Sequence, residues 1–126
     1  MVDYRVVRVE GMRFDVLRTA VEDGKGFIAF SGRDRRGFVF DRDLEHNGRT
    51  FPCYRIRGNA HENLVAIGLL FHMGSRLGAG RDGDDVRFYK VTALGRAYFE
   101  DAVRRRDRAE QRKRDTDEWT RAYHSR

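Results

Sequence analysis

Arginine, asparagine and histidine residues gather in one short segment of the chain, residues 55–63. Asparagine and arginine side chains hydrogen-bond to the edges of bases, and cationic side chains bind phosphate. Asn59 and Glu62 have the spacing at which an asparagine caps a helix and an acidic side chain reaches back to the first turn. The segment therefore predicts a helix beginning at Asn59 whose exposed side chains contact DNA, and the candidate residues are Arg55, Arg57, Asn59, His61 and Asn63.

An ordinary solvated helix is the alternative for this segment, because Glu62 would face phosphates unfavourably.

The polar, glycine-rich stretch 74–85 holds two further candidates, Arg76 and Arg81, which suit contact with phosphates or a minor groove. Three aspartates in the same stretch offset these charges, so a loop without a partner is an equally good interpretation. The string Asp-Gly-Asp-Asp at 82–85 lacks the distal glutamate of a calcium loop, so no metal site is expected.

The most basic part of the chain is residues 104–114, where seven of eleven residues are cationic and two are anionic. This excess of five positive charges predicts a segment that follows phosphates, with Arg104, Arg105 and Arg108 as candidate contacts, or a helix that docks on an acidic protein. A solvated, charged helix is the alternative. The whole chain has a net charge of +6 and a sequence pI near 10.0, which favours polyanions as partners.

The chain shows no arrangement of residues typical of an enzyme. Cys53 is the only cysteine, and the spacing of the four histidines does not indicate a Cys–His pair. We therefore expect no catalytic residue, no cofactor and no disulfide, and a reducing, cytoplasmic setting. The longest apolar run, residues 64–71, is too short for a membrane span.

The 126 residues suffice for one modest core. Residues 2–9 predict a short strand, and residues 12–23 a helix with one apolar face. The runs 27–30 and 37–40 predict a hairpin, and the alternating residues 50–57 predict an edge strand or an extended segment because they include Pro52.

The second half of the chain has clearer signals. The helix from Asn59 should end at Gly68, and residues 69–73 and 86–92 should form a second hairpin around a long loop. Thr92 should cap a last helix with an apolar face through Val103. Trp119 and Tyr123, four residues apart, predict contact with the body of the protein or with a second copy.

The order of elements over residues 59–103 resembles the second half of a winged helix-turn-helix domain. The residues that carry this resemblance are the run Leu64–Leu70 with Gly68, the glycine-rich loop, and Tyr-Lys-Val-Thr-Ala-Leu-Gly-Arg at 89–96. In that family a helix leads into a two-stranded wing, and a Thr-x-x-Gly-Arg pattern opens the last helix. Residues 27–57 depart from the family pattern, because strand-like runs stand where the short second helix is usual.

The resemblance implies an α+β fold: a small winged-helix domain over residues 1–103, with an extra N-terminal strand and a β-hairpin insertion, followed by an Arg-rich helix or tail over 104–126. It further implies a small transcriptional regulator or accessory factor that contacts duplex DNA through the helix at 59–67 and the wing at 69–92, and a homodimer formed through the C-terminal helix. The alternative is a protein-binding module, of the phage or mobile-element accessory type, that docks an acidic partner. RNA binding by the basic tail alone is the third possibility.

Overall fold

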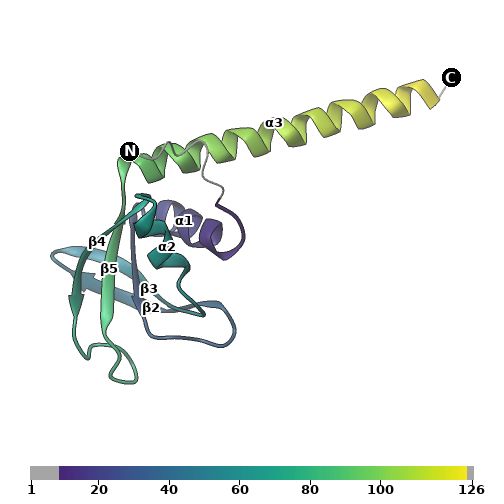
Figure 1. Ribbon diagram of the computed structural model, residues 1–126. Helices are drawn as coiled ribbons and strands as arrows, with labels where there is room; N and C mark the ends of the chain where they lie inside the picture. Colours follow the sequence, from purple (N-terminus) through teal and green to yellow (C-terminus); the bar gives the residue numbers. More distant parts are fainter. Residues whose placement is uncertain (1–8, 125–126) are drawn as a thin grey trace.

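The computed structural model describes residues 9–124, in which three strands follow the first helix and two strands separate the second helix from a long last helix (Figure 1). The fold is α+β, as the sequence predicts. The predicted N-terminal strand over residues 2–9 lies outside the described residues except for Val9. The elements in chain order are α1 (Met12–Glu22), β1 (Phe27–Ser31), β2 (Phe38–His46), β3 (Arg49–Ile56), α2 (Ala60–Ala66), β4 (Leu70–Arg76), β5 (Val86–Val91) and α3 (Ala93–His124).

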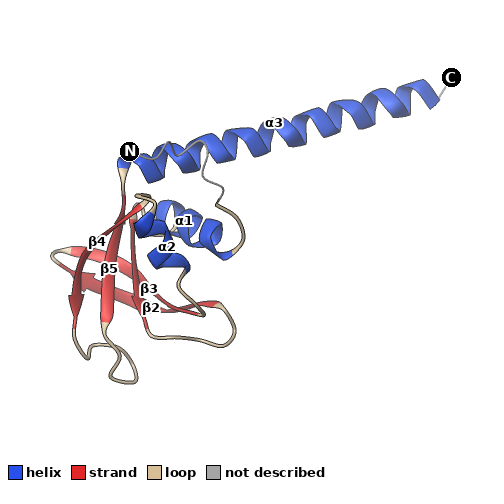
Figure 2. Ribbon diagram, viewed as in Figure 1, coloured by secondary structure: helices blue, strands red, loops and turns tan. Residues whose placement is uncertain are grey.

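The five strands form one mixed sheet in the order β2-β3-β1-β5-β4 (Figure 2). Strands β1 and β3 are parallel, and the other neighbours are antiparallel. One face of the sheet packs against α1, α2 and the beginning of α3, and the main core lies there. A second, smaller core lies on the opposite face, formed by Ala29, Phe51, Cys53, Val86 and Phe88 with side chains packed around them.

The predicted hairpin between residues 27–30 and 37–40 is wrong. Strand β3 lies between β1 and β2, so these two runs do not pair. The hairpin consists instead of β2 and β3, joined at Asn47 and Gly48, whose φ angles of 50° and 77° suit the tight turn that the Asn-Gly pair favours. The prediction that residues 50–57 form an edge strand is also wrong, because β3 lies between β2 and β1. Pro52 is tolerated there because β3 pairs with β1 through Cys53 and Tyr54, which follow the proline.

The predicted second hairpin is confirmed, and it connects α2 to α3. Strand β4 runs through Arg76, so the connecting loop is residues 77–85. The hydroxyl of Thr92 caps α3 as predicted: it accepts a hydrogen bond from the backbone N–H of Gly95 at 2.9 Å and donates one to the carbonyl of Gly68 at 2.6 Å. Gly95 is required here because a Cβ at this position would overlap the carbonyl oxygen of Leu69.

Helix α3 consists of a packed part and a projecting part. Tyr98 and Phe99 are buried against the body, and the Tyr98 hydroxyl accepts a hydrogen bond from the backbone N–H of Val9 at 3.0 Å. Burial ends after Val103, where the sequence loses its apolar face, but the helix continues without a break and leaves the body (Figure 1). No helix in the described range has the length and apolar character that crossing a membrane requires.

Candidate nucleic-acid interface

The five predicted contacts around α2 do not share one environment. Arg57, Asn59 and Asn63 are exposed, as a nucleic-acid contact requires. Asn59 occupies the N-cap position of α2, but its side chain makes no capping hydrogen bond, so this part of the prediction is wrong. The Glu62 carboxylate does not reach back to the first turn either, because it pairs with Arg87 at 3.1 Å.

The prediction that His61 is exposed is wrong. The residue is only 7% exposed, because α2 turns Ala60, His61 and Leu64 towards the sheet. Its ring stacks on Phe30 with the centroids 4.5 Å apart. Burial lowers the pKa of His61 below the ordinary value, so the ring is neutral at pH 7. A buried, neutral imidazole carries no charge to pair with a phosphate.

Asn59 and His61 line a cleft of about 540 Å³ between the start of α2 and the loops after β1 and β3. The carboxyl ends of the parallel strands β1 and β3 meet there, which is where ligands commonly bind in mixed sheets. Other lining residues are Asp84, Asp85 and Arg87. Because side chains of both signs surround the cleft, it offers no uniformly positive surface to a phosphate.

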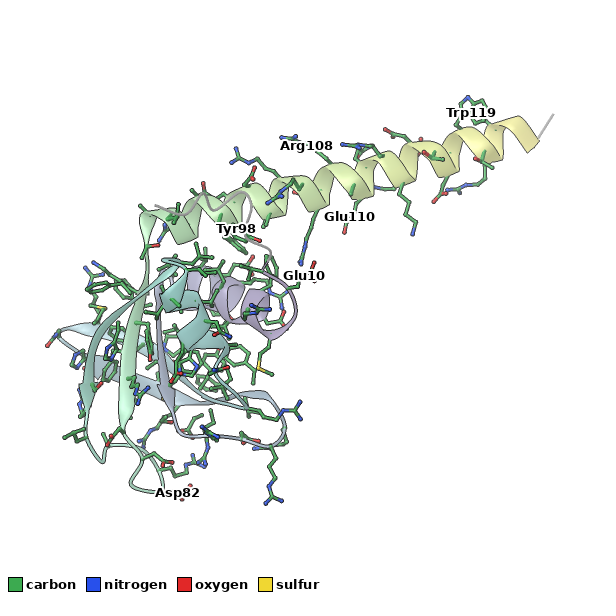
Figure 3. All side chains as sticks on the ribbon, in the orientation of Figure 1. Glu10, Asp82, Tyr98, Arg108, Glu110 and Trp119 are labelled. Atoms are coloured by element: carbon green, nitrogen blue, oxygen red, sulfur yellow. The ribbon has the colours of Figure 1, made fainter. Side chains whose placement is uncertain are left out.

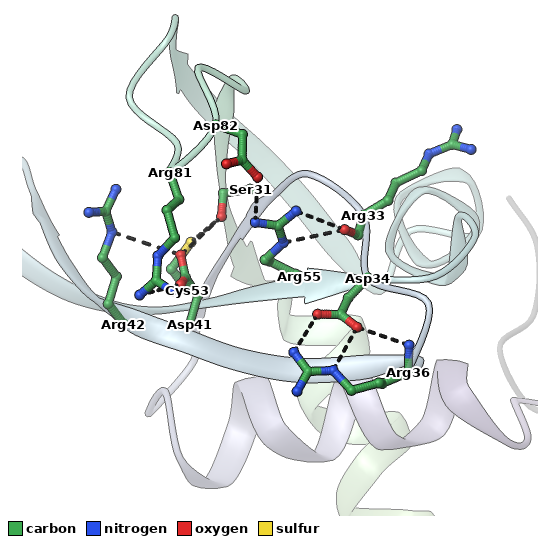
Figure 4. Close-up of polar contacts among 10 residues, drawn as sticks. All are labelled: Ser31, Arg33, Asp34, Arg36, Asp41, Arg42, Cys53, Arg55, Arg81 and Asp82. Carbon is green, nitrogen blue, oxygen red and sulfur yellow. Dashed lines mark hydrogen bonds and ion pairs between the residues drawn. The ribbon is translucent and has the colours of Figure 1, made fainter.

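Arg55 is held by contacts with other parts of the protein. Its guanidinium pairs with Asp82 at 3.1 Å and donates two hydrogen bonds to the carbonyl of Arg33, at 3.0 and 3.3 Å (Figure 4). The hydrogen bond to Asp82 raises the pKa of Arg55. Arg55 thus links β3 to the loop after β1 and to the loop between β4 and β5, and Asp82 neutralises its charge.

The predicted wing arginines also have internal partners. Arg81 pairs at 3.3 Å with Asp41, whose side chain is 3% exposed, and Arg76 donates a hydrogen bond to the carbonyl of Glu45 at 2.9 Å. Arg42 donates a further hydrogen bond to the carbonyl of Ala79 at 2.7 Å. These contacts connect β2 to β4 and the loop 77–85, so the loop is fastened to the body.

Cys53 lies at the end of a buried polar chain beside these contacts. Its thiol donates a hydrogen bond to the Ser31 hydroxyl at 3.3 Å, and that hydroxyl donates one to Asp41 at 3.5 Å (Figure 4). Burial raises the pKa of the Cys53 thiol, which keeps it protonated. Within residues 9–124, no cluster of three or more histidine, cysteine or acidic side chains is arranged to hold a metal ion.

The predicted arginine contacts of α3 are open to solvent. Arg104, Arg105 and Arg108 are all exposed, and of the ion pairs recorded among the described residues one involves residues 104–114, Arg105 with Asp101 at 3.4 Å. Arg104, Arg108 and Arg112 follow one another at four-residue spacing, so they share one side of the helix. Arg108 lies on the part of α3 that is clear of the body (Figure 3).

A set of cations and aromatic rings that the sequence does not predict lies on the sheet face opposite the helices, and we term it the basic–aromatic face. The Arg49 guanidinium lies 4.5 Å from the ring centroid of Phe27, the Lys90 ammonium 5.3 Å from Phe71, and the Arg76 guanidinium 5.4 Å from Phe88. The six residues come from β1, β3, β4 and β5. Their association depends on strand register, and no local signal in the sequence reveals it.

No protein-family model, curated protein or solved structure matches this chain. The structure leaves two groups of predicted contacts open to solvent, one around α2 and one on α3. Arg55, Arg76 and Arg81 are engaged in contacts with the body, although Arg76 and Arg81 remain exposed.

Proposed function

We propose that this protein binds DNA and that the basic part of α3, residues 104–114, holds the phosphate backbone. The observation that carries the proposal is an exposed helical segment with seven cations and two anions. Eleven helical residues span about 16 Å, and duplex DNA carries about one phosphate charge per 1.7 Å of its axis. The cations of this segment therefore lie along a length that faces several phosphates at once.

Helix α2 supplies the second contact in this proposal. Arg57, Asn59 and Asn63 are exposed at or just before α2, and arginine and asparagine are the side chains best suited to read base edges. Arg55 and Arg81 are left out of the proposed interface, because acidic partners already occupy their guanidinium groups. His61 is left out because it is buried.

The proposal is tested by fluorescence anisotropy with a labelled 20-base-pair duplex at low salt. The variant Arg104→Gln/Arg108→Gln/Arg112→Gln should bind at least tenfold more weakly than the wild type, because three phosphate contacts are lost. The control variant Arg13→Gln/Arg33→Gln/Arg35→Gln removes the same net charge from exposed positions outside α3 and should bind within about threefold of the wild type. Equal losses in the two variants would mean that only net charge matters, and an absence of wild-type binding would overturn the proposal.

Docking of an acidic protein is the second candidate, and Trp119 favours it. This side chain is 69% exposed and lies on the same side of α3 as Arg108 and Arg112. A large aromatic residue among arginines is typical of energetically important positions in protein interfaces. Competition with poly-glutamate distinguishes the candidates: DNA binding predicts that the duplex is preferred at least tenfold, whereas an acidic-protein site would bind both polymers with similar affinity.

A further inference from the structure

Cations and aromatic rings alternate in a row across four neighbouring strands of the basic–aromatic face. Arg49 of β3 lies over Phe27 of β1, Phe27 is paired in register with Lys90 of β5, and Lys90 is paired with Phe71 of β4. The row crosses four strands, so its two ends are about 14 Å apart, which is three times the distance between neighbouring strands. The row is therefore long enough for an extended segment of a few residues or nucleotides.

The rings of the face differ in their exposure. Phe88 is fully buried and is covered both by Arg76 and by the ring of His46, which stacks on it with the centroids 4.0 Å apart. Phe27 is half-buried under Arg49. Phe71 is 53% exposed, with a single cation, Lys90, near its ring. Phe71 is thus the ring of this face on which another planar group has room to stack.

The charge along this row of residues is positive. Lys90 and Arg49 are exposed, and the ion pairs recorded among the described residues include neither of them. An open aromatic ring with one cation beside it and a second cation at the other end of the row, about 14 Å away, suits unpaired nucleotides, because a base can stack on the ring while the cations bind phosphates further along the strand. A purely apolar partner would leave these cations without counter-charge, so the charge pattern favours nucleic acid over an apolar protein surface.

We infer that the basic–aromatic face binds an unpaired DNA strand, with a base stacked on Phe71 and phosphates held by Lys90 and Arg49. This inference rests on the proposed function and extends it: the preferred ligand is duplex DNA with a single-stranded extension. Lys90 stands three residues before α3 begins, so the face and the helix that holds the duplex belong to one continuous stretch of chain.

The test compares three labelled DNAs: a blunt 20-base-pair duplex, the same duplex with a six-nucleotide thymidine extension, and the duplex with a six-unit abasic extension. The abasic extension keeps the phosphates and removes the bases. The wild type should bind the thymidine extension about tenfold more tightly than the blunt duplex, and the abasic extension should lose most of that gain.

Phe71→Ala should abolish the preference for the thymidine extension and leave the affinity for the blunt duplex within twofold of the wild type. Phe40→Ala is the matched control, because Phe40 is 52% exposed on β2 and lies outside the row of cations. Phe71→Trp should retain the preference. Equal binding of the blunt and extended duplexes would overturn this inference while leaving the proposed function intact, and an absence of binding to every DNA would overturn both.

Discussion

Buried His61 makes the stability of the protein depend on pH. Its pKa is lowered by burial, so the folded protein holds fewer protons at this ring than the unfolded chain does in mildly acidic solution. The contribution is fully present above the unfolded pKa, about 6.5, and is lost as the pH falls towards the lower folded value. The change in stability is therefore expected below neutral pH.

His61→Phe should reduce this pH dependence, because phenylalanine keeps an aromatic ring over Phe30 but does not titrate. Urea denaturation at pH 7.5 and pH 5.0 measures the effect. The wild type should lose more stability on acidification than the variant. His72→Gln, at an exposed position, is the control and should behave like the wild type. An identical loss in the wild type and in His61→Phe would show that other groups cause the pH dependence.

Residues whose partners are close in sequence could be predicted, and residues with remote partners could not. The capping role of Thr92 follows from a local pattern at a helix start, and the hydrogen bond from the backbone N–H of Gly95 to its hydroxyl confirms it. Arg55 is bound by Asp82, which is twenty-seven residues away, and nothing local indicates that contact. The burial of His61 depends on which side of the seven-residue helix α2 faces the sheet, and the sequence of so short a helix does not show that.

At the scale of the elements, the same distinction explains the error in the first hairpin. The runs at 27–30 and 37–40 do form strands, as their sequence predicts, but sequence patterns carry little information on which strands pair. Asn47-Gly48 was the stronger turn signal, and it joins the strands that do pair, β2 and β3. The basic–aromatic face was missed for the same reason, because it exists only once four strands are in register.

The loop 77–85 depends on Asp41 for its attachment to β2. Asp41→Asn removes the charge that holds Arg81 and should destabilise the protein by about 1–3 kcal/mol. Limited trypsin digestion should then cleave after Arg81 several-fold faster than in the wild type, because the loop is released. Asp43→Asn, at an exposed position on the same strand, should leave the cleavage rate unchanged. An unchanged rate in Asp41→Asn would show that Arg42 and other contacts suffice to hold the loop.

The whole molecule combines a packed body with a helical arm. The body buries apolar residues on both faces of the sheet. In the arm, which begins at residue 104, the described side chains are all exposed. Among the described residues the arm touches the body at its start, where the Arg106 guanidinium lies 3.9 Å from the ring centroid of Phe14. A helix that is polar on all sides is typical of a segment with an external partner or of a helix maintained by its own charge pairs. The excess of cations over anions in residues 104–114 favours an anionic partner.

The most direct test of this account is the salt dependence of duplex binding. For a helix that holds phosphates, the logarithm of the association constant should fall linearly with the logarithm of the salt concentration, with a slope of about −0.9 per phosphate contact. Arg104→Gln/Arg108→Gln/Arg112→Gln should therefore give a slope about 3 smaller in magnitude than that of the wild type, if each arginine holds one phosphate. A wild-type affinity that does not change with salt, or the same slope in both proteins, would contradict the account.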